Sequence, residues 1–307
     1  MNPFRGIVLK VLSVCVFVTM SSCVKYVSGP VPPGEIVFFR SAFALPVVLA
    51  WAMATGRLKG VFRTENGIGH FWRGLVGTTA MALGFLALGL LPLPEVVAIG
   101  YAAPLLATIF AAMFLGEAVR FYRLSAIALG LVGVFIILYP RMSVLDIAAA
   151  DKLETVGAFA ALLGAVFAAL AAVFVRKLVQ QERSTTIVIY FSITAASLSL
   201  LTLPFGWTLP SPGTGALLIL IGLLGGLGQI LMTESYRYAD MGVIAPFEYV
   251  SMLIAIAVGF FVFSEVPKVA TLAGAALIAA AGIVIIIRER QLGLERAKAR
   301  KTMTPQG

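Results

Sequence analysis

Glu248 and Arg40 lie inside long apolar runs of this sequence, and they are the first candidates for chemistry. Glu248 is the deepest carboxylate, about six residues and roughly 9 Å along its run, just after Pro246, whose missing N–H can break a helix. A charge at a helix centre costs about 2.5–3.5 kcal/mol on insertion scales. We therefore expect Glu248 to accept a hydrogen bond from a ligand or to carry a proton. The alternative is a packing acid that a neighbouring helix satisfies.

Arg40 is the second charge, and it lies roughly 8 Å below the opposite membrane face. A direct pair with Glu248 is disfavoured, because in an apolar core about 30 Å thick the two depths leave more than about 10 Å between them. Glu35 and Glu95 lie nearer to the level of Arg40. We expect a structural ion pair between Arg40 and one of these two acids. An electrostatic trap for an anionic ligand is the alternative.

Glu117 and Glu265 each end an apolar run, on opposite membrane faces. The dipole at a helix C-terminus disfavours an anion, so each acid needs a cationic partner. We expect Arg120 or Arg123 to pair with Glu117, and Lys268 to pair with Glu265. Both acids are interpreted as gate or boundary residues.

Several aromatic side chains could line a cavity between the apolar runs. An aromatic ring offers a stacking face, and a tyrosine or tryptophan adds one polar group. The candidates are Tyr101, Tyr249, Trp72, Tyr190 and Phe247. The alternative is a belt of aromatic residues at the membrane surface.

The sequence contains few of the residues from which catalytic and metal sites are usually built. His70 is the single histidine, and with Cys15 and Cys23 it cannot assemble the usual zinc or haem ligands. The glycine-rich stretch 222–228 lies inside an apolar run, and its spacing matches that of stretch 74–77, which is typical of close helix packing in membranes rather than of a phosphate loop. We therefore expect no catalytic residue, no metal, no cofactor and no enzymatic activity. A channel is disfavoured as well, because neither a ring of charge nor a filter loop is visible.

The elements that must position these residues are membrane helices. Of the 307 residues, 60% are hydrophobic and 12% are charged, against about 45–50% and about 25% in soluble domains. About 20 apolar residues cross a bilayer, and the sequence predicts an all-α integral membrane protein with ten transmembrane helices. The predicted spans are 7–27, 35–54, 70–90, 94–115, 122–139, 156–175, 186–204, 213–233, 242–263 and 269–287.

The charges between the spans predict the orientation of the chain. The net charge is +9, and most basic residues fall on one set of joints, which the positive-inside rule places in the cytoplasm together with both termini. The basic tail 289–307 is interpreted as a partner of anionic lipid rather than of nucleic acid. The basic set contains Arg5, Lys10, Arg57, Lys59, Arg63, Arg73, Arg120, Arg123, Arg176, Lys177, Arg183, Arg237 and the lysines and arginines of the tail.

A shift of 148 positions superposes features of the two halves of the chain. Two homologous halves are predicted, residues 5–140 with spans one to five and residues 154–288 with spans six to ten. Because five is odd, the second half enters the membrane from the other face, and inverted repeats are typical of alternating access. The stretch Met20–Cys23 loosely resembles a lipoprotein signal, but cleavage there would leave four spans in the first half, so we expect the first span to be retained. The shift places Gly74 on Gly222, Gly77 on Gly225, Tyr101 on Tyr249 and Glu117 on Glu265.

With these features the chain resembles the drug/metabolite transporter superfamily, and within it the EamA-type ten-helix carriers. The resemblance covers residues 5–290 and rests on the two five-span halves and on four stretches. Stretch 246–265 is also similar to bacterial riboflavin uptake transporters. The four stretches are Glu35–Arg40, Gly116–Glu117, Ala245–Tyr249 and Ser264–Glu265.

This resemblance implies a secondary transporter of a small organic solute in a bacterial-type inner (plasma) membrane. Import of riboflavin or a similar vitamin or metabolite is the first expectation, and export of amino acids or related metabolites is the alternative. No P-loop is visible, so we expect no use of ATP by this chain. Proton coupling and facilitated diffusion both stay open. The expected partners are a small-molecule substrate and the lipid bilayer, without nucleic acid, and a homodimer is left open.

Overall fold

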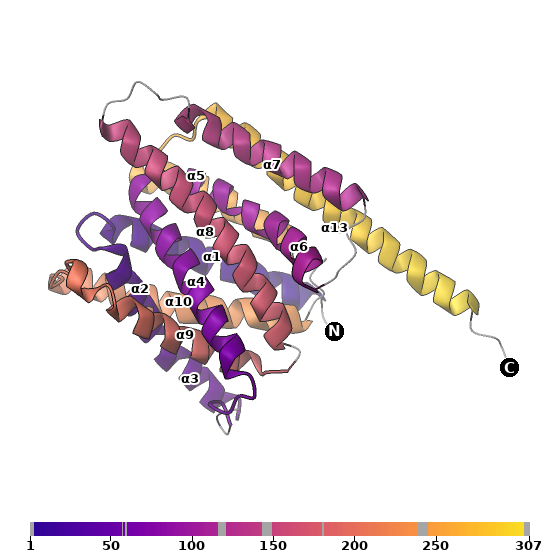
Figure 1. The fold of residues 1–307 in the computed structure, drawn as a ribbon, viewed down its shortest axis with the longest axis horizontal. Coiled ribbons are helices and arrows are strands. Elements are labelled where there is room, and N and C mark those ends of the chain that lie inside the picture. Colours follow the sequence, from indigo (N-terminus) through magenta and orange to yellow (C-terminus); the bar gives the residue numbers. More distant parts are fainter. Residues whose placement is uncertain are drawn as a thin grey trace.

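The chain was analysed as a computed structural model. The structure describes residues 3–56, 58, 60–115, 121–142, 149–179, 181–238 and 245–303. Glu117 and Arg120 therefore lie outside the described residues. Throughout the described ranges the regular secondary structure is helical, without a strand (Figure 1).

The elements follow one another in the order labelled in Figure 1. They are α1 (Pro3–Val27), α2 (Pro33–Ala42), α3 (Ala44–Ala54), α4 (Gly67–Leu90), α5 (Leu93–Gly100), α6 (Ala102–Leu115), α7 (Phe121–Met142), α8 (Ala149–Val179), α9 (Ser184–Leu200), the 3-10 helix η1 (Leu203–Phe205), α10 (Pro212–Tyr238), the 3-10 helix η2 (Ala245–Tyr249), α12 (Val250–Phe263) and α13 (Val269–Met303).

Many of these helices are long and apolar enough to cross a membrane. Within the described residues, six helical stretches meet this condition by length and composition. Four shorter apolar helices, 124–140, 184–200, 247–263 and 269–284, lie where further spans are predicted. The fold is thus that of an all-α membrane protein, and the total of ten crossings stays a prediction.

Prolines break two of the predicted spans. Pro46 has no N–H for the carbonyl of Ala42, and the helix is interrupted between α2 and α3. Pro104 likewise has none for the carbonyl of Gly100, and α5 ends there. Tyr101 is therefore placed at a break between two helices.

Helices pack in pairs. α4 packs along α8, α1 along α10 and α7 along α13, and Figure 1 shows α7 and α13 side by side at one edge of the bundle. A Cβ at Gly133 would lie 2.7 Å from the carbonyl oxygen of Gly274. The backbones of α7 and α13 therefore approach closely at these two glycines.

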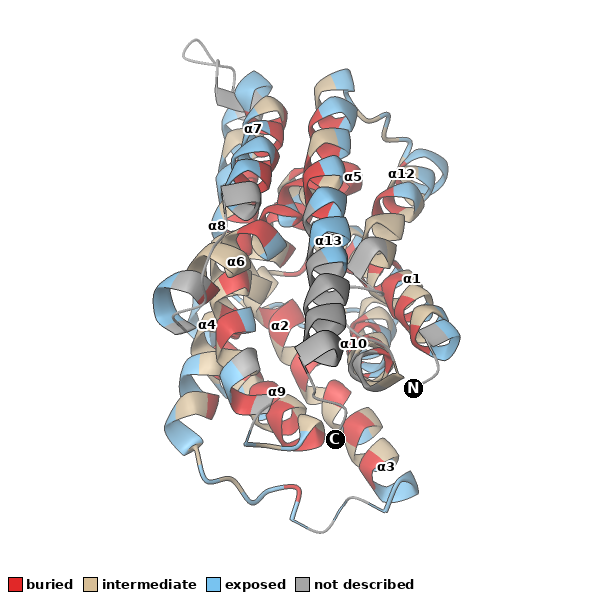
Figure 2. Ribbon diagram, turned by 90° about the vertical axis from the view of Figure 1, so that its right-hand side faces the viewer, coloured by how far each residue is buried: buried red, intermediate tan, exposed pale blue. Residues whose placement is uncertain are grey.

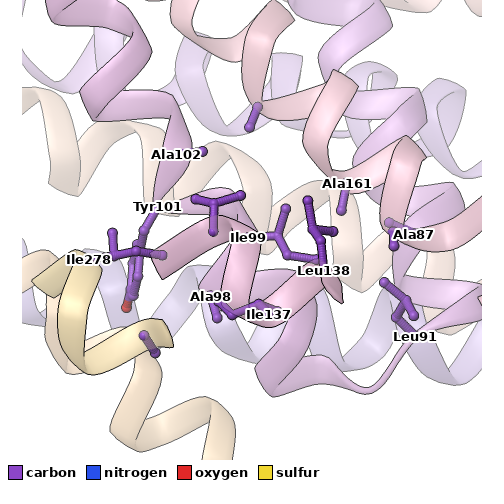
Figure 3. Packing of buried hydrophobic residues seen from close by; sticks show 14 of the residues in the cluster. Ala87, Leu91, Ala98, Ile99, Tyr101, Ala102, Ile137, Leu138, Ala161 and Ile278 are labelled. Carbon is purple, nitrogen blue, oxygen red and sulfur yellow. The ribbon is translucent and has the colours of Figure 1, made fainter. Parts of the chain in front are cut away.

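Two large clusters of buried apolar side chains fill the bundle. One joins α4 to α8, α12 and α13, and includes Tyr101, Ile99 and Ile278 (Figure 3). The other lies between α1, α2, α10 and α12. Large apolar side chains such as Phe135 and Phe261 are exposed, and Figure 2 shows exposed stretches along α7 and α12, the helices that carry them. Such exposure suits a surface that faces lipid rather than water.

Candidate functional site

An ion pair joins the first helix to the broken segment that carries Glu248. The Nζ atom of Lys10 lies 3.2 Å from Oε2 of Glu248. The side chain of Lys10 is 2% exposed and that of Glu248 is 47% exposed, so the carboxylate faces open space while the ammonium group is enclosed. The sequence analysis assigned Lys10 to the cytoplasmic joints. That assignment was wrong, because Lys10 lies inside α1, about 10 Å from the start of the helix.

The segment around Glu248 departs from α-helical geometry. Residues 245–249 form η2, and α12 begins at Val250. Pro246 lies within η2, in agreement with the predicted break. The carbonyl of Glu248 accepts a hydrogen bond from the Ser251 hydroxyl at 2.6 Å. At this break the backbone carbonyl of Glu248 therefore has a side-chain hydroxyl as a hydrogen-bond donor.

The structure brings the two repeat-related tyrosines together. The rings of Tyr101 and Tyr249 meet edge to face with their centres 5.1 Å apart. The Tyr101 hydroxyl lies 2.5 Å from Oγ of Ser251 and thereby joins the same network as the Glu248 carbonyl. Two helix breaks, at Tyr101 and at η2, therefore face each other.

A glycine makes room for Tyr249. A Cβ at Gly282 of α13 would overlap the Tyr249 hydroxyl group. Ile278, one turn earlier on α13, belongs to the same apolar cluster as Tyr101 (Figure 3). The tyrosine pair thus packs against α13, and the Tyr101 hydroxyl lies 3.4 Å from the backbone carbonyl oxygen of Glu248.

A second ion pair lies at the other end of α1. Nζ of Lys25 lies 2.8 Å from Oε1 of Glu265. The backbone N–H of Leu93 donates to Oε2 of Glu265 at 2.9 Å, and Nζ of Lys25 donates to the carbonyl of Leu91 at 2.6 Å. The prediction that Lys268 pairs with Glu265 was therefore wrong. The carboxylate faces back towards α1 and α5, whereas Lys268 is exposed.

Arg40 does not form the predicted ion pair. The carboxylate of Glu35 accepts instead from the backbone N–H of Thr208 at 3.0 Å, and Nε and Nη1 of Arg40 find no hydrogen-bond partner among the described residues. The guanidinium lies 5.7 Å from the ring centre of Phe191, and that of Arg73 lies 4.0 Å from the same centre. Arg73, which the sequence analysis counted with the cytoplasmic joints, lies inside α4.

Tyr190 lies in a different cluster. Its ring stacks on His70 with a centre distance of 4.6 Å, and its hydroxyl donates to the Phe62 carbonyl at 2.9 Å. Nε2 of His70 lies 3.7 Å from Oε1 of Glu182. Tyr190 therefore joins α9 to the start of α4 and the preceding loop, away from the tyrosine pair.

Glu182 lies in the loop before α9 and is held by that cluster. Its Oε1 accepts from the Thr64 hydroxyl at 2.5 Å and from the backbone N–H of Glu65 at 3.1 Å. Burial by itself raises the pKa of Glu182, but these hydrogen bonds and the nearby His70 outweigh burial and hold the pKa below its ordinary value.

The remaining candidates are spread over the molecule. Trp72 is exposed and meets Phe71 edge-on, as the alternative of a surface belt suggests. Phe247 is half-buried in η2. Glu95 is buried in the first turn of α5. The predicted role of Glu117 lies outside the described residues.

Three cations were not predicted to take part in these contacts: Lys10, Lys25 and Arg73. All three fall inside predicted spans, 7–27 and 70–90, and this was the signal that could have separated them from the joints. A charge well inside a span faces a protein interior in most membrane proteins.

The EamA-like transporter family model matches residues 4–139 and 155–288. A pseudopaline exporter of Pseudomonas aeruginosa is 30% identical over 285 residues, which cover 91% of this chain and 95% of the exporter. An S-adenosylmethionine uptake transporter of Rickettsia bellii is 28% identical, covering 87% and 88%. A riboflavin transporter of Vibrio cholerae is 27% identical, covering 90% and 91%.

A solved crystal structure shares the fold. It superposes with a TM-score of 0.62 at 23% identity, covering 94% of this chain and 96% of that chain. The relatives are transporters with different substrates. The apolar helices indicate a multi-pass membrane protein. The family match and the relatives indicate that it transports small solutes. The chain belongs to the EamA-like transporter family.

Proposed function

We propose that this protein is a secondary transporter that moves its solute by alternating access between α1 and the η2–α12 segment. The observation that carries the proposal is that two ion pairs connect α1 to this part of the chain: Lys10–Glu248 joins α1 to η2, and Lys25–Glu265 joins it to the segment that follows α12. Along α1 the two lysines are about 22 Å apart at 1.5 Å per residue. The two ion pairs thus lie near opposite membrane faces.

Alternating access requires two gates, one on each side of the membrane, and the two ion pairs could form them. A solute path must close on one side before it opens on the other. Lys10–Glu248 is proposed as the cytoplasmic gate and Lys25–Glu265 as the gate on the other side. Because Glu248 is half-exposed while Lys10 is enclosed, a solute or a proton that reaches the carboxylate would weaken this gate directly.

The packing of the helices supports two inverted halves, 5–140 and 154–288. The shift of 148 positions relates α1 to α8 and α4 to α10. The contact between α1 and α10 therefore corresponds, in the other half, to the contact between α8 and α4. The structure contains both contacts. Inverted halves of this kind give inward-facing and outward-facing states of similar energy.

Tyr101, Tyr249 and Glu248 are proposed as the solute contacts at the cytoplasmic gate. The tyrosine rings offer a stacking surface, and the carboxylate and the Ser251 hydroxyl offer polar contacts. Phe247 lies in the same segment and is proposed as a further aromatic contact. In this proposal the solute lies against both helix breaks.

Riboflavin or a similar flat nutrient is one candidate for import. The support is the aromatic pair, which suits an uncharged ring system, together with the likeness to a riboflavin transporter at 27% identity. Export of amino acids or related metabolites is the second candidate. Two arginines support it because they suit a solute with an acidic group: Arg40 is buried, and Arg73 is half-buried with its Nε and Nη1 atoms enclosed. We favour this second candidate.

Two growth experiments separate the candidates. In a bacterium that cannot make riboflavin and lacks its own importer, an importer should permit growth at low external riboflavin. In a strain sensitive to a toxic amino-acid analogue, an exporter should raise tolerance. We expect raised tolerance without rescue by riboflavin, and loss of that tolerance in Glu248→Gln. If neither phenotype appears with the protein present in the membrane, both solute candidates are wrong.

A further inference from the structure

Two arginine side chains meet in the interior of the bundle. Arg40 comes from α2 and Arg73 from α4, and their guanidinium groups lie 5.7 Å and 4.0 Å from the ring centre of Phe191 on α9. The three helices are in mutual contact (Figure 2). The two cations are therefore close neighbours within one three-helix junction, and they repel each other.

Two nitrogen atoms of each guanidinium group find no acceptor among the residues that the structure describes. They are the Nε and Nη1 atoms, and they are buried. Glu35, the nearest acid along α2, is bound to Thr208 instead. An unpaired buried charge costs several kcal/mol, and two of them at one place are rare without a reason.

Two serines on the same helices add further free donors. The hydroxyl groups of Ser41 and Ser192 are buried without a hydrogen-bond partner in the described residues. Helical serines usually bond to a carbonyl one turn earlier. Ser41 follows Arg40 on α2, and Ser192 follows Phe191 on α9, so these two hydroxyl groups lie on two of the three helices of the junction.

A cavity of about 360 Å³ opens between the same helices. It is lined by Val37 of α2, Leu75 of α4 and Leu198 of α9, among others. Val37 lies one helical turn before Arg40, and Leu75 lies next but one to Arg73. The volume is in the range of small-ligand sites, and the lining residues belong to the helices that carry Arg40, Arg73 and Phe191, although none of these three side chains lines the cavity itself.

We propose that Arg40 and Arg73 form a binding site for the carboxylate or phosphate group of a small organic anion. Guanidinium groups bind such oxyanions through paired, charge-assisted hydrogen bonds. The apolar cavity would hold the remainder of the molecule, and the ring of Phe191 lies near both guanidinium groups. This inference rests on the proposed function in one respect, since it takes the anion to be part of the transported solute.

Binding to the purified full-length chain tests the site without any transport assay. Thermal unfolding in lipid-free detergent is measured with sodium acetate and with sodium phosphate, against sodium chloride at equal ionic strength. We expect a saturable rise of the unfolding midpoint with acetate or with phosphate, and the better of the two identifies the group. Arg40→Gln and Arg73→Gln should each weaken binding on the order of tenfold to a hundredfold.

Arg63→Gln is the matched control, because it removes the same charge from an exposed loop position. It should bind like the unaltered chain. The proposal is overturned if neither oxyanion raises the midpoint, or if both buried-arginine variants keep the full shift.

Arg40→Met separates a binding role from a structural one. Replacing an unpaired buried charge by an apolar side chain of similar length should raise the unfolding midpoint in the absence of oxyanions. The same variant should lose the response to acetate and phosphate. A lower midpoint in chloride would assign Arg40 to the fold and count against the site.

Two further outcomes are distinguishable. A shift with phosphatidylglycerol, but with neither acetate nor phosphate, would assign the arginines to a lipid headgroup and overturn the proposal. If oxyanions bind and the arginine variants abolish binding while the intact chain confers neither growth phenotype, the anion site stands and the proposed transport function fails.

Discussion

Lys25 and Glu265 lie 2.8 Å apart and fasten the last turn of α1 to the segment that follows α12. Their side chains are 14% and 17% exposed, so little water screens the pair. Leu91 and Leu93, at the joint between α4 and α5, complete the network through their backbone groups. Four elements therefore meet at these two charges.

The first prediction concerns this ion pair. Glu265→Gln and Lys25→Met should each lower the unfolding midpoint, because each leaves a largely buried charge without its counterion. The double variant should lose less than the two single losses together, with a coupling free energy of about 1 kcal/mol or more. Thermal unfolding of the four purified proteins measures this coupling. Additive losses would mean that the two charges do not interact.

The second prediction concerns the other ion pair. Glu248→Gln should destabilise the protein more than Lys10→Met, because the first removes the carboxylate beside an enclosed ammonium group, whereas the second removes the ammonium group beside a half-exposed carboxylate that water can solvate. The difference should be about 1 kcal/mol or more, measured by unfolding of the purified variants. Glu65→Gln, on an exposed loop residue, is the control and should change little. Equal losses for both gate variants would contradict the asymmetry.

The third prediction concerns close helix packing. A Cβ at Gly222 would overlap Cβ of Phe43 and would lie 2.7 Å from the Phe39 carbonyl oxygen. Gly222→Ala should therefore cost about 1–3 kcal/mol through overpacking. Gly215→Ala is the matched control in the same helix, since a Cβ there meets nothing within 4 Å. It should be neutral or slightly stabilising, because alanine favours helix. Unfolding midpoints that rank the two variants in the reverse order would refute this packing.

The fourth prediction concerns pH. The pKa of Glu182 in the folded protein lies below its ordinary value of 4.5. Its ionised form therefore stabilises the fold above that value, and the contribution is lost as the pH falls below about 4.5 towards the folded pKa. Glu182→Gln should flatten the dependence of the unfolding midpoint on pH in this acidic window, and Thr64→Ala should flatten it in part. An unchanged profile in Glu182→Gln would show that the loop does not depend on this carboxylate.

The fifth prediction concerns orientation. Reporter fusions after Thr64, Ala149 and Lys301 should report the inside, the outside and the inside of the cell, because most basic residues fall on one set of joints. An outside signal for the tail would remove the argument for inverted halves and for the assignment of the two gates to membrane faces.

The sequence by itself determined the kind of fold and several local features. Composition and apolar runs identified a helical membrane protein because each span must satisfy its backbone hydrogen bonds within itself. Pro246 marked the irregular segment η2, since proline cannot donate to the preceding turn. The shift between halves related Tyr101 to Tyr249, and the structure places these rings in contact.

Only the tertiary structure decided which charges meet. Sequence reasoning assigned each charge a depth along its helix, and it therefore expected Arg40 near Glu35 and Glu265 near Lys268. The actual partners depend on the rotation and the tilt of each helix, and on long side chains that extend about a helical turn in either direction. For this reason the sequence did not predict that Lys10 pairs with Glu248 or that Lys25 pairs with Glu265. Nor did it predict that Arg73 lies near Arg40, beside Phe191.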